Sequence, residues 1–163
     1  ELHEKSLQIK LKALGPDHPE VGISYNNMAN ICQQQGHLDS AMVLHEKNLE
    51  IILEALGPDH PDVGTSYNNM AIVRQRQGHL DSAMEMHEKS LQIKLKALGP
   101  DHPEVGISYN NMANICQQQG HLDSAMVLHE KNLEIILETR GPDHPDVGTC
   151  YNNMALVRQR QGH

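Results

Sequence analysis

Residues 15–20 have the sequence Gly-Pro-Asp-His-Pro-Glu, and nearly the same six residues return at 57–62, 99–104 and 141–146. Successive copies are 42 residues apart, and the whole chain of 163 residues follows this period, with copies that start at Glu1, Val43, Glu85 and Val127. A fixed period of this length is typical of solenoids, in which short helical units stack on one another. The period therefore indicates the fold class.

The four copies are of two alternating types. Residues 1–42 differ from 85–126 only at Leu2, which is Met86 in the later copy, and residues 43–79 differ from 127–163 at four positions. The first two copies, in contrast, differ from each other at 11 of 42 positions. The repeated unit is thus an 84-residue pair, and either recent duplication or deliberate design would produce it.

Each period contains two helix signals separated by two breaks. The Gly-Pro at 57–58 ends one helix, because glycine is favoured just past a helix C-terminus and proline prevents continuation. Asp17 stands three residues before Glu20, which resembles a capping box and predicts the start of the next helix, and the even copies have Asp62 as the second residue.

Helix A is predicted from Pro19 to about Gln35, and helix B from Leu38 to Leu56. Each carries an apolar stripe at helical spacing. The stripes are Val21, Tyr25, Met28, Ala29 and Cys32 in helix A, and Leu38, Ala41, Met42, His45, Leu49, Ile52 and Leu56 in helix B. One such pair cannot bury its own stripe, so neighbouring pairs must stack.

We therefore expect residues 1–163 to form a single all-α repeat array. It consists of a partial helix B at 1–14, helix pairs at 19–56, 61–98 and 103–140, and an unpaired helix A at 145–161. The two ends are complementary parts of one unit, and neither carries the polar face of a capping repeat, so we predict head-to-tail stacking between copies of the chain.

Composition and charge argue against several classes. The formal net charge is -8 with neutral histidine, which disfavours nucleic acid and anionic membranes as partners. No apolar run approaches the roughly 18 residues of a membrane span, and no targeting pattern is present at the start. The three cysteines have no metal-ligand spacing and suit a reducing compartment, so we expect a cytoplasmic protein.

The 12 histidines occupy three repeated positions, represented by His18 before proline, His37 in the hairpin turn and His45 within helix B. No HExxH pattern or close histidine pair at i, i+4 occurs, so we expect neither a metal site nor a cofactor, and we interpret His45 and its copies as packing residues. No phosphate loop or nucleophile motif is present, and we predict no enzymatic activity.

The residues Asn26-Asn27-Met28-Ala29, Gly36, Ala41 and the closing Leu-Gly-Pro-Asp-His-Pro resemble the tetratricopeptide repeats of kinesin light chains, which also have 42 residues. The resemblance covers the whole chain. It implies an α-solenoid of tandem helix-turn-helix repeats that forms a right-handed superhelix, with helix A lining a concave groove. It also implies that the second asparagine of each pair binds the main chain of an extended peptide; these residues are Asn27, Asn69, Asn111 and Asn153.

Amide side chains share one face of helix A, and we predict that they line a groove for a peptide or protein segment. With the substitutions of the even copies, the candidate residues are Asn26, Asn27, Asn30, Gln34, Asn68, Asn69, Arg76, Asn110, Asn111, Asn114, Gln118, Asn152, Asn153 and Arg160. A second interpretation has equal weight: the amides face water or tie neighbouring helices together. Arg76 and Arg160 either select an acidic or carboxylate-ended peptide or are simply solvated.

Charges alternate along helix B. Lys10 and Lys12 of the odd copies align with Ile52 and Glu54 of the even copies, so adjacent B helices could form lysine–glutamate pairs. Together with the complementary ends, this pattern gives the alternative to a peptide-binding scaffold, which is a self-assembling structural rod with no separate ligand.

Overall fold

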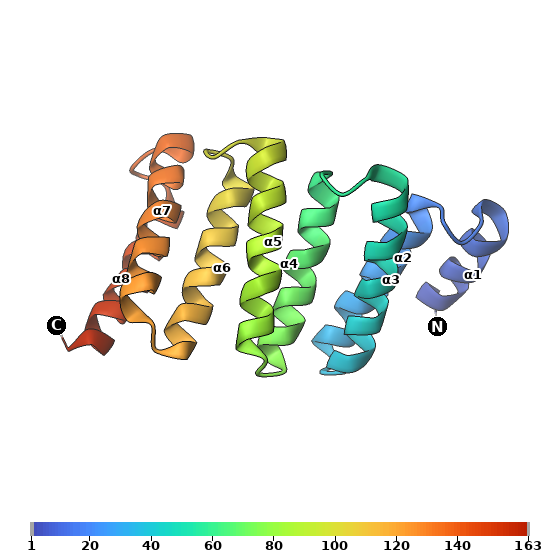
Figure 1. Ribbon diagram of the computed structural model, residues 1–163, viewed down its shortest axis with the longest axis horizontal. Coiled ribbons are helices and arrows are strands. Elements are labelled where there is room, and N and C mark those ends of the chain that lie inside the picture. The colour runs from blue at the N-terminus through green and yellow to red at the C-terminus, as the bar shows by residue number, and fades with distance from the viewer. Residues whose placement is uncertain (1, 163) are drawn as a thin grey trace.

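A computed structural model describes residues 2–162, which form eight α-helices and no strand. The helices stand side by side in chain order from the N-terminal to the C-terminal end (Figure 1). They are α1 (Leu2–Leu14), α2 (Pro19–Gln34), α3 (Leu38–Leu56), α4 (Pro61–Arg76), α5 (Leu80–Leu98), α6 (Pro103–Gln119), α7 (Leu122–Arg140) and α8 (Pro145–Gln161). The predicted all-α tandem-repeat fold is confirmed. Glu1 and His163, which the predicted array includes, lie outside the described residues.

Each helix packs on its neighbours in the chain, and α2 with α3, α4 with α5 and α6 with α7 make the most extensive contacts. The buried residues form separate clusters along the array instead of one central core. One cluster joins Ala41 and Met42 of α3 to Met70 and Val73 of α4. This arrangement is expected of a solenoid, in which each repeat contacts only its neighbours.

The predicted apolar stripe of helix B ends earlier than expected. Leu56, the last residue of α3, is 40 % exposed. Spacing alone puts Leu56 on the stripe, but the chain turns away at the end of the helix and leaves this side chain only partly covered. Burial on α3 therefore ends at Ile52, where the next helix still packs against it.

The helix A starts are capped by histidine, so the predicted capping box of Asp17 with Glu20 is wrong. His18 is the N-cap, and its Nδ1 accepts a hydrogen bond from the Glu20 backbone N–H at 3.2 Å. The same bond is made by His60, His102 and His144. Proline follows each histidine, and a residue before proline is held in the extended backbone conformation that an N-cap requires.

A second set of histidines is fully buried within helix B, namely His45, His87 and His129, which confirms the prediction that they are packing residues. Neither ring nitrogen of His45 or His87 has a hydrogen-bond partner. In His129, Nε2 lies 2.8 Å from Nε2 of Gln117. Burial lowers the pKa of both His45 and His87 to about 4, because charging an imidazole away from water is unfavourable.

Among residues 2–162, no helix is long and apolar enough to cross a membrane. Within the same range, no group of three or more histidine, cysteine or carboxylate side chains is arranged to hold a metal ion.

Candidate binding face

The asparagine pairs of helix A form a ladder that joins successive repeats. Nδ2 of Asn69 on α4 donates to Oδ1 of Asn26 on α2 at 3.1 Å. The next two rungs run from Asn111 to Asn68 at 3.0 Å and from Asn153 to Asn110 at 3.2 Å. We call these six side chains the amide ladder. The first asparagine of each pair thus accepts and the second donates, so the interpretation in which amides tie neighbouring helices together describes these residues.

The amide ladder leaves hydrogen-bonding capacity unused. A carboxamide carries two N–H donors and an oxygen with two lone pairs, and each rung uses one donor and one lone pair. The six ladder residues are only partly buried, while Asn27 and Asn152 lie beyond the two ends of the ladder and are exposed. The face of α2, α4, α6 and α8 therefore presents repeated amide groups to solvent.

The other predicted groove residues lie further along helix A. Arg76 donates from Nη1 to the backbone oxygen of Gln33 at 2.5 Å, and Arg160 donates to that of Gln117 at 3.4 Å. Each arginine therefore binds a carbonyl in the last turn of the preceding helix A, which also accepts the backbone N–H of Gly36 or Gly120. Asn30 and Asn114 are half-buried, and Gln34 and Gln118 are exposed.

Lysines of helix B pair with the start of helix A. Nζ of Lys94 at the end of α5 lies 2.9 Å from Oε2 of Glu104 at the start of α6, and Lys10 pairs with Glu20 in the same way at 2.9 Å. The expected pairing between adjacent B helices is replaced by these contacts. The reason is that the turn between the two helices brings residues ten positions apart together.

The junction of α4, α5 and α6 buries its lysine completely. The Lys94 side chain is 2 % exposed, and its Cγ lies 3.3 Å from the position that a Cβ on Gly64 would occupy. Ser90, one turn earlier on α5, is also buried, and its hydroxyl has no hydrogen-bond partner. The absence of a side chain at Gly64 makes room for the lysine stem.

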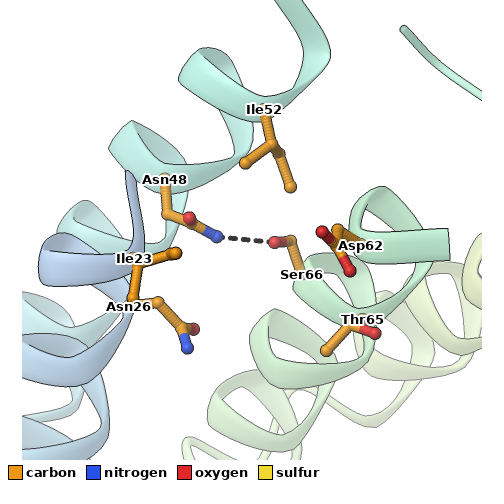
Figure 2. Close-up of a pocket in the computed structure, with 7 residues that line it drawn as sticks. All are labelled: Ile23, Asn26, Asn48, Ile52, Asp62, Thr65 and Ser66. Carbon is orange, nitrogen blue, oxygen red and sulfur yellow. Dashed lines mark hydrogen bonds between the residues drawn. The ribbon is translucent and has the colours of Figure 1, made fainter. Parts of the chain in front are cut away.

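The equivalent junction of α2, α3 and α4 contains a pocket of about 300 Å³ (Figure 2). Asn48 and Ile52 of α3 lie above it, with residues of α2 on one side and of α4 on the other. Nδ2 of Asn48 donates to Oγ of Ser66 at 2.6 Å, across the space between α3 and α4 (Figure 2). The lining residues are Ile23, Asn26, Asn48, Ile52, Asp62, Thr65 and Ser66.

A second pocket, of about 170 Å³, occupies the same position 84 residues later, between α6, α7 and α8. Here Nδ2 of Asn132 donates to Sγ of Cys150 at 3.0 Å. The carboxylate at its edge, Asp146, pairs with the guanidinium of Arg140. At the position of Arg140, the first pocket has Leu56.

Models of two tetratricopeptide repeat families match the chain, one over residues 43–96 and 85–131 and the other over residues 1–20 and 21–62. The chain belongs to the tetratricopeptide repeat family. Repeats of this family (TPRs) generally mediate protein–protein interaction or self-assembly, and the fold is typically a non-catalytic scaffold. A search of curated proteins found no match.

Solved structures agree with the kinesin light chain-like kind of TPR. BtubC (BKLC) from P. vanneervenii is similar with a TM-score of 0.87 and 22 % identity, over 99 % of this chain and 64 % of that one. A protein of Podosopora anserina, described as a kinesin light chain with nearly identical TPR-like repeats, is similar with a TM-score of 0.82 and 27 % identity, over 99 % and 76 %. The chain thus spans about two thirds of the length of the first.

The pockets were not predicted from the sequence, although a signal for them was present. Four of the 11 differences between the two repeat types fall at this junction of the TPR array. At these positions the odd repeats have Ser90, Lys94, Glu104 and Ile107. The even repeats have, in the same order, Asn48, Ile52, Asp62 and Thr65. Part of the alternation between the repeat types therefore falls where helix B meets the next helix A.

Proposed function

We propose that this TPR array holds an extended peptide or protein segment along the face formed by α2, α4, α6 and α8. The amide ladder carries this proposal, because it is continuous over four A helices and retains unused donors and acceptors on each rung. A peptide main chain needs both kinds of partner at regular intervals. Carboxamides supply both without selecting a particular sequence.

Charge supports a polypeptide partner. The net charge of -8 opposes a nucleic-acid ligand, since the phosphate backbone would be repelled. Arg76 and Arg160 keep four of their five guanidinium N–H groups beyond the single bond each makes to a backbone oxygen. We include in the proposal that these two groups receive carboxylates of the bound segment.

The test is isothermal titration of the chain with a panel of labelled, extended acidic and neutral peptides. Asn69→Ala with Asn111→Ala should weaken binding of all members about tenfold or more, since each lost hydrogen bond contributes ~1 kcal/mol. Gln92→Ala, on the exposed surface of α5, is the matched control and should leave affinity unchanged. Arg76→Gln with Arg160→Gln should weaken only the acidic peptides. Unchanged affinity in the asparagine variant would refute the proposal.

A second candidate function is self-assembly of the array by head-to-tail contact. Tyr151 and Leu156 on α8 are 54 % and 55 % exposed, whereas Tyr25 in the first helix A is covered by Lys47, whose Nζ lies 5.3 Å from the ring centroid. Ile9 on α1 is exposed as well. Sedimentation velocity over a wide concentration range tests this candidate, because growth of the particle with concentration supports it and a constant monomer excludes it.

A further inference from the structure

Four carboxylates occupy equivalent positions in the first turn of each helix A, and their partners differ. Glu20 pairs with Lys10, Glu104 with Lys94 and Asp146 with Arg140. Asp62 is the exception. Among the described residues, no lysine or arginine lies within ion-pair distance of it, and its nearest basic group is Nδ1 of His60 at 3.7 Å. That nitrogen already accepts a hydrogen bond from the Asp62 backbone N–H at 3.2 Å.

The junction at Lys94 shows what this position accommodates. The lysine stem passes between α4 and α5 against Gly64, and its ammonium ends 2.9 Å from the Glu104 carboxylate. The side chain is almost completely removed from solvent. The same backbone surroundings recur at α2, α3 and α4, because the repeats are homologous there.

At the Asp62 junction no lysine stem lies against the helix A glycine. Oδ1 of Asn48 lies there instead, 3.1 Å from the position that a Cβ on Gly22 would occupy, and a pocket remains beside Asp62. Ile52 stands in place of the lysine, and Ile52 and Asp62 both line a pocket of about 300 Å³. Ile23 and Ile52 provide apolar walls for a hydrocarbon stem. Asp62, Asn26 and Thr65 contribute oxygen atoms around the opening, and Figure 2 shows these groups on opposite sides of the space.

We propose that the pocket between α2, α3 and α4 receives a lysine side chain of the bound segment. Its stem lies against the two isoleucines and its ammonium pairs with Asp62. This inference rests on the proposed function, since the lysine belongs to the segment held along the helix A face. Asp62 and Arg76 lie at opposite ends of α4, and the helical rise of 1.5 Å per residue separates them by about 20 Å. A segment bound along this helix would therefore meet an acidic group at one end and a basic group at the other.

The second pocket is already supplied with a cation by the chain itself. Arg140 pairs with Asp146 at its edge, and the pocket is smaller. Among the described residues, Asp62 thus lines a pocket without a lysine or arginine partner, whereas Asp146 at the second pocket is neutralised by Arg140. This difference follows from a single position, at which Leu56 in one copy corresponds to Arg140 in the other.

The experiment is a chemical-shift titration of the isotope-labelled full chain with Nα-acetyl-lysine methylamide. The matched probe is Nα-acetyl-norleucine methylamide, which has a similar stem but no charge. We expect saturable shifts for the side-chain amide of Asn48 and the backbone amides near Thr65 with the lysine probe only. Asp62→Asn should weaken binding about two- to fivefold, the range of an exposed ion pair.

Two variants test the site further. The first should fill the pocket beside Asp62, and the second should create a similar site beside Asp146. The combined change Asn48→Ser, Ile52→Lys, Asp62→Glu and Thr65→Ile converts this junction to the type found at α4, α5 and α6, which folds in the same chain. It should abolish the shifts, because the chain's own lysine fills the space. Arg140→Leu should add a second set of saturable shifts around Asn132, since Asp146 would then lack its partner.

Equal shifts with both probes, or shifts that persist in the four-residue variant, would overturn the lysine site. Asn69 and Asn111, which are replaced in the peptide test, do not line this pocket, so the two proposals fail separately. If the chain binds the lysine probe but no extended peptide, the lysine site is supported and the proposed peptide-binding function is refuted. If the chain binds peptides that contain lysine or norleucine equally well, the peptide-binding function is supported and the lysine site is refuted.

Discussion

The junction of α4, α5 and α6, which contains Lys94, and the junction of α2, α3 and α4, which contains Ile52, pack the same three-helix arrangement with different side chains. At Lys94 a long side chain fills the space between three helices, a small Ser90 stands beside it, and Glu104 neutralises the charge. At Ile52 the side chain is short, and Asn48 compensates by donating to Ser66 across the junction. The difference shows that four residues changed together can preserve a repeat backbone while opening or closing a pocket.

The two junctions also differ in the surroundings of their buried histidines. Protonation of these histidines should give the largest change in the free energy of unfolding. Burial lowers the pKa of His45, and for His87 burial is joined by the charge of Lys94. Both folded pKa values are about 4, below the unfolded value of 6.5, so the unfolded chain binds more protons between these limits. The free energy of unfolding should be highest above pH 6.5 and fall toward pH 4, by about 3 kcal/mol for each histidine.

Urea unfolding between pH 7.5 and 4 measures this dependence. His45→Leu with His87→Leu should flatten the curve, because no buried imidazole remains to be protonated at these sites. Lys94→Ile should flatten it slightly, through His87 alone. A wild-type stability that does not change between pH 6.5 and 4 would contradict the prediction.

Removing the buried lysine should give the next largest effect. Lys94→Ala leaves an internal cavity and a Glu104 without its partner, so we expect a loss of about 2 to 4 kcal/mol in the free energy of unfolding. Converting the whole junction by Ser90→Asn, Lys94→Ile, Glu104→Asp and Ile107→Thr should restore most of that loss. If the converted junction were as unstable as Lys94→Ala, the four positions would not form a packing unit.

Helix A glycines test the close approach of helix B at the even junctions. A Cβ on Gly106 would lie 2.8 Å from Oδ1 of Asn132, so Gly106→Ala should destabilise by about 1 to 3 kcal/mol. The equivalent Gly148 on α8 has nothing within 4 Å of such a Cβ, and alanine there should stabilise the helix by about 0.5 to 1 kcal/mol. Thermal melts of the two single variants decide the matter. A rise in melting temperature in both variants would show that helix propensity alone governs both sites.

Removal of the N-cap histidines should lower the free energy of unfolding equally at both junction types. This is the smallest effect that we expect. His60→Ala and His102→Ala each remove an acceptor held 3.2 Å from a backbone N–H, at a cost of about 1 kcal/mol. Asp101→Ala is the control and should change stability by less than about 0.5 kcal/mol, because the aspartate does not cap the helix. Equal losses from Asp101→Ala and His102→Ala in urea unfolding would revive the capping box that the structure replaces.

Local patterns predicted the elements well. The predicted helix B, Leu38 to Leu56, agrees with α3, and the predicted helix A from Pro19 to about Gln35 ends within one residue of α2. The N-cap was missed because aspartate is the commoner cap, although the proline after His18 indicated the histidine. The amide face was recognised, but its spacing could not show whether Asn69 binds a ligand or Asn26.

The sequence by itself determined the period, the helices and their order, because these depend on glycine, proline and apolar spacing within one repeat. The tertiary structure alone decided which polar groups pair, since a rung of the amide ladder joins residues 43 positions apart. It also decided that Lys94 is buried and pairs with Glu104, while Asp62 lines a pocket. Such contacts depend on how three helices approach one another, and that approach is set by packing between repeats.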